Sequence, residues 1–337
     1  MSTMQATTVP QRRKLPVPPR LVPVFATGAL LVVMYGIGIS QYQAFSDPQV
    51  LLNIFIDRGF VLVVAVGMTF VLLTGGIDLS VGSVVAMTAM VSASLLESGN
   101  IPAGVVLVIA LAIGPTLGFL MGCVIHYFEI QPFIVTLAGM FFARGMCTFI
   151  SDEAIPIKNE FWVTAAQSRI RFGDNFISPS VIVVIVVVLI GAAVLAYTRF
   201  GRNVYAIGGD QQSALLMGLP VGRTKIAVYT ISGFCSAIGG ILLSFYTLSG
   251  DSLIAIGMEL DVIAAVVIGG TLLTGGSGYV FGTVLGVLVL GVIQTLITFD
   301  GTLNSWWTRI VIGGLLFAFI LLQRLTGATP RARSAGG

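Results

Sequence analysis

The sequence predicts an all-α membrane protein, a polytopic bundle of about ten transmembrane helices. Only 9% of the 337 residues are Asp, Glu, Lys or Arg, against about 25% in soluble domains. Hydrophobic residues make up 56%, and the mean hydropathy is +1.01. Apolar runs such as Val181–Tyr197 lack the alternation of a β-barrel strand and have roughly the length that crosses a bilayer as a helix. These observations exclude a soluble enzyme, a nucleic-acid binder and a disordered regulator.

Ten apolar segments are candidates for membrane spans. In chain order they are Leu21–Ile39, Ile54–Leu73, Leu79–Leu96, Pro102–Tyr127, Phe133–Ile150, Pro179–Thr198, Ile226–Leu248, Leu260–Leu273, Tyr279–Phe299 and Trp307–Gln323. The first follows basic residues, but it exceeds a signal-peptide core and no clear cleavage site follows, so we expect an uncleaved helix. The eighth is short and the fifth contains Arg144, so either is a candidate for a broken or re-entrant segment. Eight or nine spans are the alternatives.

Basic residues predict the orientation, because loops rich in Lys and Arg stay in the cytoplasm. Ten spans place the N-terminal tail (1–20), the loop 199–225 and the C-terminal tail (325–337) on one side of a transmembrane domain (21–324). That side and its flanks carry Arg12, Arg13, Lys14, Arg20, Arg199, Arg202, Arg223, Lys225, Arg324, Arg331 and Arg333; the other side carries Lys158, Arg169 and Arg171. Both tails are therefore expected inside, and an odd number of spans is disfavoured.

An internal repeat lies within the spans. Leu72-Leu73-Thr74-Gly75-Gly76 recurs 200 positions later as Leu272-Leu273-Thr274-Gly275-Gly276, and Gly82-Ser83-Val84 recurs as Gly282-Thr283-Val284. Each copy joins two apolar segments through a glycine-rich break. Duplicated halves around a central site are common in transporters, whereas the alternative explanation is close helix packing at small residues. The pattern favours a duplicated, parallel transport core.

The loop 199–225 contains a short predicted helix. Asp210 is suited to cap its N-terminus, two turns run through Met217, and Gly218 ends it with Pro220 beyond. A helix of this length cannot span a bilayer. It either packs only on its own protein or presents Leu215, Leu216 and Met217 to a partner, because exposed apolar side chains need a covering surface.

Several motifs resemble one family. The segment Gly201-Arg202-Asn203-Val204-Tyr205-Ala206-Ile207-Gly208-Gly209, followed by Ala214 and Met217-Gly218, resembles the ATPase-contacting loop of permease subunits of bacterial ribose-type ABC sugar importers. Val66–Ser83 is similar to the most typical stretch of that family. The resemblance extends from about Pro48 to Gln323. Phe299–Thr308 and Thr136–Phe142 are similar to one branch, the second permease subunit of the galactofuranose importer.

The resemblance implies a multi-pass subunit of the bacterial inner membrane that translocates a monosaccharide. A periplasmic binding protein would deliver the sugar, a second permease, related or identical, would complete the path, and ATPase subunits would bind ATP and Mg²⁺. The residues implied in ATPase coupling are Gly201, Arg202, Tyr205, Ala206, Gly208, Gly209, Ala214, Leu215 and Gly218. From the repeat and the charges within spans, the residues expected in the translocation core are Thr74, Gly75, Gly76, Asp78, Thr274, Gly275, Gly276 and Arg144.

The sequence also predicts what this chain does not do. It contains no G-x-x-x-x-G-K-[ST] phosphate loop, because the segment from Gly218 to Lys225 has the wrong order and spacing. Cys123, Cys147 and Cys235 lie far apart in apolar stretches without a CxxC pair, which disfavours a metal site. We therefore expect no catalytic residue, no metal and no cofactor in this chain, and ATP hydrolysis by a partner.

Charged residues within spans cost about 2.5–3.5 kcal/mol each, so each needs an explanation. Asp78 follows the first glycine pair and either caps the third span, accepting from the amide of Ser80 or Val81, or lies in the pathway. Arg144 either pairs with a carboxylate or carbonyl inside the bundle or donates to a sugar hydroxyl. Asp57 and Arg58 are expected to be interfacial anchors.

The long outer loop, 151–178, is rich in charge. It is either a solvated connection or, as we prefer, a docking surface for the binding protein that uses Asp152, Glu153 and Glu160. The main alternative function is an ion-coupled secondary sugar transporter. That class usually needs a carboxylate or histidine relay within the membrane, and this sequence offers few candidates. A channel would need a symmetric selectivity element, which is not identifiable here.

Overall fold

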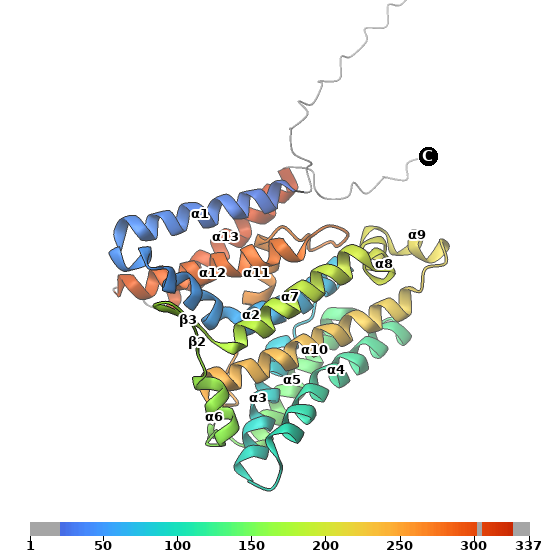
Figure 1. The fold of residues 1–337 in the computed structure, drawn as a ribbon. Helices are drawn as coiled ribbons and strands as arrows, with labels where there is room; N and C mark the ends of the chain where they lie inside the picture. Colours follow the sequence, from blue (N-terminus) through green and yellow to red (C-terminus); the bar gives the residue numbers. More distant parts are fainter. Residues whose placement is uncertain (1–20, 302–304, 326–337) are drawn as a thin grey trace, which may run out of the picture.

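The polytopic helical bundle predicted from the sequence is confirmed. A computed structural model describes residues 21–301 and 305–325, and eight helices in this part are long and apolar enough to cross a membrane. They are α1 (Val22–Gln41), α2 (Pro48–Leu73), α4 (Ala103–Tyr127), α5 (Pro132–Ile150), α7 (Pro179–Tyr197), α10 (Val221–Thr247), α12 (Val280–Asp300) and α13 (Ser305–Leu325). Figure 1 shows them side by side. Helices are the expected solution because a segment in lipid must satisfy its own backbone hydrogen bonds.

Two of the ten predicted spans are shorter helices. The third corresponds to α3 (Val81–Glu97), which has 17 residues, and the eighth to α11 (Met258–Ile268), which has 11. At 1.5 Å per residue, α11 extends only about 17 Å, roughly half of the hydrocarbon core. The expectation of a short eighth segment is therefore confirmed. The alternative of a break in the fifth is wrong, because α5 runs through Arg144 as one helix.

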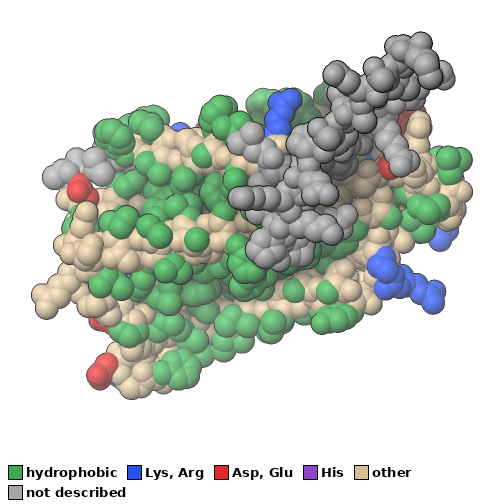
Figure 2. Space-filling view, turned by 90° about the horizontal axis from the view of Figure 1, so that it is seen from above, with side chains coloured by type: hydrophobic (Ala, Val, Ile, Leu, Met, Phe, Trp, Pro, Cys, Tyr) green, Lys and Arg blue, Asp and Glu red, His purple; other side chains and the backbone are tan. Residues whose placement is uncertain are grey.

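The centre of the bundle is formed by α2, α10 and α12, whose side chains are mostly buried. The helices α1, α4, α5, α7 and α13 surround them and expose apolar side chains such as Val32, Leu189 and Phe317. Figure 2 shows hydrophobic side chains spread over one such face, with the most prominent Lys and Arg side chains in its right-hand half. This distribution suits helices that have lipid on one side and protein on the other.

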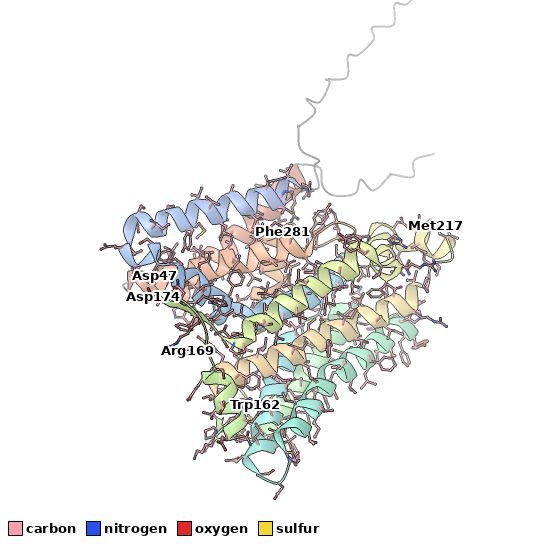
Figure 3. All side chains as sticks on the ribbon, in the orientation of Figure 1. Asp47, Trp162, Arg169, Asp174, Met217 and Phe281 are labelled. Atoms are coloured by element: carbon pink, nitrogen blue, oxygen red, sulfur yellow. The ribbon has the colours of Figure 1, made fainter. Side chains whose placement is uncertain are left out.

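The two ends of the bundle carry different structures. At one end lie α8 (Arg199–Gly209) and α9 (Gln211–Leu216); at the other lie the 3-10 helix η1 (Gln43–Ser46), α6 (Glu160–Gln167) and the hairpin of β2 (Ile170–Phe172) and β3 (Asn175–Ile177). Figure 3 labels Met217 at the first end, far from Trp162, Arg169 and Asp174 at the second. The basic loop and the outer loop thus lie on opposite sides, as predicted. The tails 1–20 and 326–337, and with them Arg12, Arg13, Lys14, Arg20, Arg331 and Arg333, lie outside the described residues.

The outer loop folds back onto the membrane helices. Strand β1 (Ile155–Pro156) pairs antiparallel with β4 (Ser249–Gly250), which follows α10. On α6, the fully buried Trp162 donates from Nε1 to Ser244 Oγ at 3.0 Å, and its ring centroid lies 4.8 Å from that of Phe245. The loop is therefore a packed cap on the outer end of α10 and not merely a solvated connection.

We predict that Trp162→Ala releases α6 from α10. The change removes a buried ring and a hydrogen bond, and Trp→Ala changes in protein interiors cost about 3–5 kcal/mol. The purified variant should unfold at a lower temperature and be cleaved faster by protease within 151–178. The neighbouring Phe161, which is 52% exposed, provides the control, and Phe161→Ala should behave like the parent. Equal protease resistance of the two variants would contradict this anchoring role.

Candidate functional site

The two copies of the internal repeat lie in direct contact. The amide of Gly276 in the second copy donates to the carbonyl of Leu73 in the first at 2.9 Å. Each copy also makes the same turn, in which the amide of Gly75 donates to Leu72 O at 2.9 Å and that of Gly275 to Leu272 O at 3.0 Å. Both turn glycines have positive φ, 77° and 87°, a conformation that residues with a Cβ atom rarely adopt. The repeat therefore marks two equivalent breaks that meet.

Helix α8 packs onto the junction of the two breaks. A Cβ atom on Gly208 would overlap the carbonyl of Leu73 and the amide of Gly276. The hydroxyl of Tyr205, one turn earlier, donates to the carbonyl of Gly278 at 2.8 Å. Burial, with a smaller contribution from Tyr279, raises the pKa of Tyr205 to about 12, so its hydroxyl remains a donor at neutral pH. One helix of the predicted coupling loop thus contacts both copies of the predicted translocation core.

The short helix predicted after Asp210 is present as α9. The Asp210 carboxylate accepts from the Ser213 amide at 2.6 Å, a hydrogen bond that lowers its pKa. Gly218 ends the turn with a φ of 75°. Leu215, Leu216 and Met217 are 64%, 87% and 68% exposed, so three consecutive apolar side chains project from the end of the molecule, where Figure 3 labels Met217.

The other residues predicted for the coupling loop differ in burial and in contacts. Gly201 is buried, and its amide donates to the capping hydroxyl of Thr198 at 3.1 Å. Ala214 is buried against Ile207 and Val221, whereas Arg202 and Gly209 are exposed and Ala206 is half-buried. The helix α8 itself was not predicted, because its glycines at 201, 208 and 209 disfavour a helix locally and only the packing against the breaks explains them.

Asp78 lies inside the bundle just beyond the first break. It is 1% exposed and accepts three hydrogen bonds: from the amide of Ser80 at 3.0 Å, the hydroxyl of Ser80 at 2.6 Å and the hydroxyl of Ser232 at 2.7 Å. The hydrogen bond from the Ser80 amide fits the expected role of Asp78 at the start of α3. The hydrogen bond from Ser232 connects the start of α3 to α10. The buried hydroxyl of Tyr229 packs against Gly76 and has no hydrogen-bond partner.

Arg144 has carbonyl partners, one of the alternatives expected from the sequence. Its Nη1 donates to Ser252 O at 2.6 Å and to Ile254 O at 2.8 Å. Both carbonyls belong to the segment between β4 and α11, so Arg144 fixes the chain that leads into the short helix. Charge-assisted hydrogen bonds of this kind are stronger than neutral ones, which explains how α5 continues through the arginine.

The remaining predicted residues separate into two groups. Thr74, next to the first break, donates from its hydroxyl to Val71 O at 2.8 Å, and Thr274 lies beside Gly75. Asp152, Glu153 and Glu160 are exposed at the outer end, at and before the start of α6, and are not brought together with the core. Among the described residues, no group of three or more His, Cys, Asp or Glu side chains is arranged to hold a metal ion.

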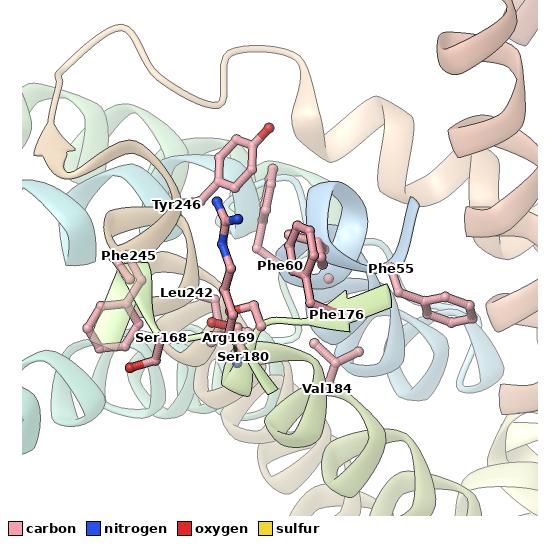
Figure 4. Close-up of a pocket in the computed structure, with 14 residues that line it drawn as sticks. Phe55, Phe60, Ser168, Arg169, Phe176, Ser180, Val184, Leu242, Phe245 and Tyr246 are labelled. Carbon is pink, nitrogen blue, oxygen red and sulfur yellow. Dashed lines mark hydrogen bonds between the residues drawn. The ribbon is translucent and has the colours of Figure 1, made fainter. Parts of the chain in front are cut away.

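Two neighbouring cavities at the outer side were missed by the sequence reasoning. One, of about 170 Å³, lies under the β2–β3 hairpin, where the Arg169 guanidinium lies 4.4 Å from the centroid of the Phe176 ring (Figure 4). The other, of about 460 Å³, lies between α2 and α12. Phe60 and Tyr246 line both. The available signal was spacing: Asn53 and Asp57, and likewise Gln294 and Thr298, are four residues apart and so share a helix face.

Comparison with known proteins confirms the resemblance to permease subunits of ribose-type ABC sugar importers. Residues 50–320 match the family described as branched-chain amino acid transport system / permease component. The chain is 44% identical over 306 residues to the inner membrane ABC transporter permease protein YjfF of Escherichia coli, covering 90% of this chain and 92% of that one. It is 40% identical over 314 residues to the fructose import permease protein FruG of Bifidobacterium longum, covering 90% and 91%.

A further relative is the ribose import permease protein RbsC of Haemophilus influenzae, 35% identical over 302 residues, covering 89% of this chain and 92% of the relative. No solved structure matches the chain. With the eight long apolar helices, these matches also confirm a multi-pass protein of the inner membrane. The positions of the individual site residues rest on the geometry described above.

We predict that two adjacent glycines respond differently to the same change. Gly208→Ala places a methyl group against the carbonyl of Leu73 and the amide of Gly276, and such overpacking costs about 1–3 kcal/mol. Gly209→Ala meets no atom within 4 Å and serves as the matched control. The Gly208 variant should lose thermal stability and become sensitive to protease between α8 and α9, whereas the Gly209 variant should match the parent. Full tolerance of Gly208→Ala would exclude the tight contact.

Proposed function

Because the chain belongs to the branched-chain amino acid transport system / permease component family, we propose that it forms the membrane path of an ATP-driven importer of a monosaccharide. Separate ATPase subunits bind ATP and Mg²⁺ and hydrolyse the nucleotide, a periplasmic binding protein supplies the sugar, and this chain catalyses no covalent step. A second permease, related or identical, completes the path.

The observation that carries the proposal is the exposed apolar end of α9. Leu215, Leu216 and Met217 would cost free energy in water unless a partner surface covers them. The helix that presents them is short, capped by Asp210 and ended by Gly218, so the three side chains are held in place. A cytoplasmic ATPase with an apolar groove is the partner that this projection suits.

The contacts of α8 supply a route for the mechanical coupling. Movement of α9 by the ATPase would displace α8, which touches the first break through Gly208 and the second through Gly208 and Tyr205. The first break is the inner end of α2 and the second leads into α12. A displacement of α8 therefore acts on two central helices together. Such a joint movement is required to open one side of the path while the other side closes.

The names of the relatives support a sugar as the substrate. Similar chains are named as import permeases for fructose, galactose or methyl galactoside, ribose and D-allose. We propose galactofuranose as the first sugar to test, because Phe299–Thr308 and Thr136–Phe142 resemble the permease of that branch; residues 302–304 of the first segment lie outside the described structure. At the outer end, the exposed Asp152, Glu153 and Glu160 are the proposed docking residues for the binding protein.

The function is tested by reconstitution into proteoliposomes. The chain with its ATPase, second permease and binding protein should take up labelled monosaccharide only when ATP is present inside, and galactofuranose, fructose, ribose and galactose should be compared in the same vesicles. The chain alone should take up none. Uptake by the chain alone that follows a proton or sodium gradient without ATP would overturn the proposal in favour of a secondary transporter.

We predict that Leu215→Asp uncouples the ATPase. A carboxylate at the centre of the apolar end would be buried unpaired against the partner, so co-purification of the ATPase and sugar-dependent ATP hydrolysis should both fall by at least about tenfold, while membrane insertion is unchanged. Gln212→Asp introduces the same charge on the exposed first turn of the same helix, where it suits the helix dipole, and should retain both activities. Normal coupling in the Leu215 variant would remove α9 as the docking element.

A further inference from the structure

The larger outer cavity is lined by polar side chains that are exposed at membrane depth. Asn53, Asp57 and Arg58 on α2, Tyr246 on α10, and Gln294, Thr295 and Thr298 on α12 border its space of about 460 Å³. Among them, Asp57, Tyr246, Gln294 and Thr298 are exposed in the isolated chain. These residues come from the three central helices and not from the peripheral helices, whose exposed side chains are largely apolar.

Helix geometry places the deeper part of this polar surface, at Asp57 and Gln294, within the bilayer. Gln294 lies six residues before the outer end of α12, about 9 Å along the axis, and Asp57 lies nine residues after the start of α2, about 14 Å along. By contrast, Ile185 on α7 lies six residues from the outer start of its helix and exposes an apolar side chain. Hence polar and apolar surfaces occur at comparable depth on different faces of the bundle.

Lipid cannot cover the polar face at low cost. A carboxylate, a carboxamide and several hydroxyls in hydrocarbon would lose hydration without gaining enough partners, and such groups in membrane proteins face a water-filled cavity or another protein. The only hydrogen bond that Asp57 makes to the other residues of the cavity wall is a long one, in which the Tyr246 hydroxyl donates at 3.3 Å. The surface is therefore suited to contact water and a polar solute.

The lining also indicates the class of solute. Carboxamides, hydroxyls, one carboxylate and one guanidinium offer both donors and acceptors with balanced charge. Aromatic rings border the same space: Phe60 and Tyr246 lie with ring centroids 6.2 Å apart, and Phe299 lies at the outer edge. Mixed hydrogen-bonding groups beside apolar ring faces fit a neutral polyhydroxylated ring better than an ion or an apolar molecule. The volume is within the range of small-molecule sites.

We propose that this cavity is the outer sugar-binding subsite of the translocation path, and that the second permease closes its open side. The inference rests on the proposed function for the identity of the solute. The smaller cavity under the β2–β3 hairpin, which Arg169 borders (Figure 4), lies against the same two rings, Phe60 and Tyr246.

The test is the accessibility of introduced cysteines in the assembled complex in membranes. Gln294→Cys is the probe position, and Ile185→Cys, equally far from the outer end of its helix, is the control. The parent chain, in which Cys147 and Cys235 are buried, gives the baseline. A membrane-impermeant thiol reagent reacts with thiolates in water, so we expect modification of Gln294→Cys to be at least about tenfold faster than that of Ile185→Cys. Adding the sugar that the complex carries, at a concentration that saturates the binding protein, should slow the modification of Gln294→Cys severalfold.

Two results would overturn the subsite. Equal and slow modification of both cysteines would show that the face is covered by lipid or protein. Fast modification that a transported sugar leaves unchanged would show a wet surface that does not bind the sugar. Monosaccharide uptake by the parent complex is measured in the same membranes as a separate test of the proposed function. If that function is wrong, the parent complex takes up no monosaccharide, whatever the accessibility of Gln294→Cys.

Discussion

The inner half of the molecule depends on one contact between backbones, in which the Gly276 amide donates to the Leu73 carbonyl. A helix that stops inside a membrane leaves amides and carbonyls without partners, and lipid supplies none. Here α2 ends at the first break, and its last carbonyl, that of Leu73, accepts from the Gly276 amide of the second break. Glycine permits this because a Cβ atom on Gly208 or Gly275 would occupy the space that the facing backbone needs. The duplication is therefore a structural requirement as well as a sequence pattern.

The scarce charges of the chain are also arranged by this constraint. Asp78 is not compensated by a cation but by two serines, since its carboxylate accepts from Ser80 and Ser232. Arg144 likewise uses two main-chain carbonyls. Both charges thus stabilise the irregular segments next to the short helices α3 and α11, where free backbone groups are available.

The sequence predicted features that depend on local order and missed those that depend on packing. The repeat, the cap at Asp210 and the stop at Gly218 follow from residues close together in the chain, and the structure contains all three. Helix α8 has three glycines, so local propensity opposes it and only contact with the breaks explains it. The possible break in α5 was wrong because the partners of Arg144 lie more than a hundred residues away. The outer cavity collects side chains from three helices, which no single segment reveals.

The proposed coupling site and the outer cavity are joined by the same two helices. At its inner end α2 meets α8 through Leu73, and about 30 Å further along, twenty residues away, Asn53 lines the cavity. Helix α12 follows the second break and reaches the cavity at Gln294. The buried hydroxyls of Thr69 and Thr283 lie 2.7 Å apart and fasten the two helices near their inner ends. In the proposed function, a displacement of α8 would be passed along these two packed helices to the walls of the cavity.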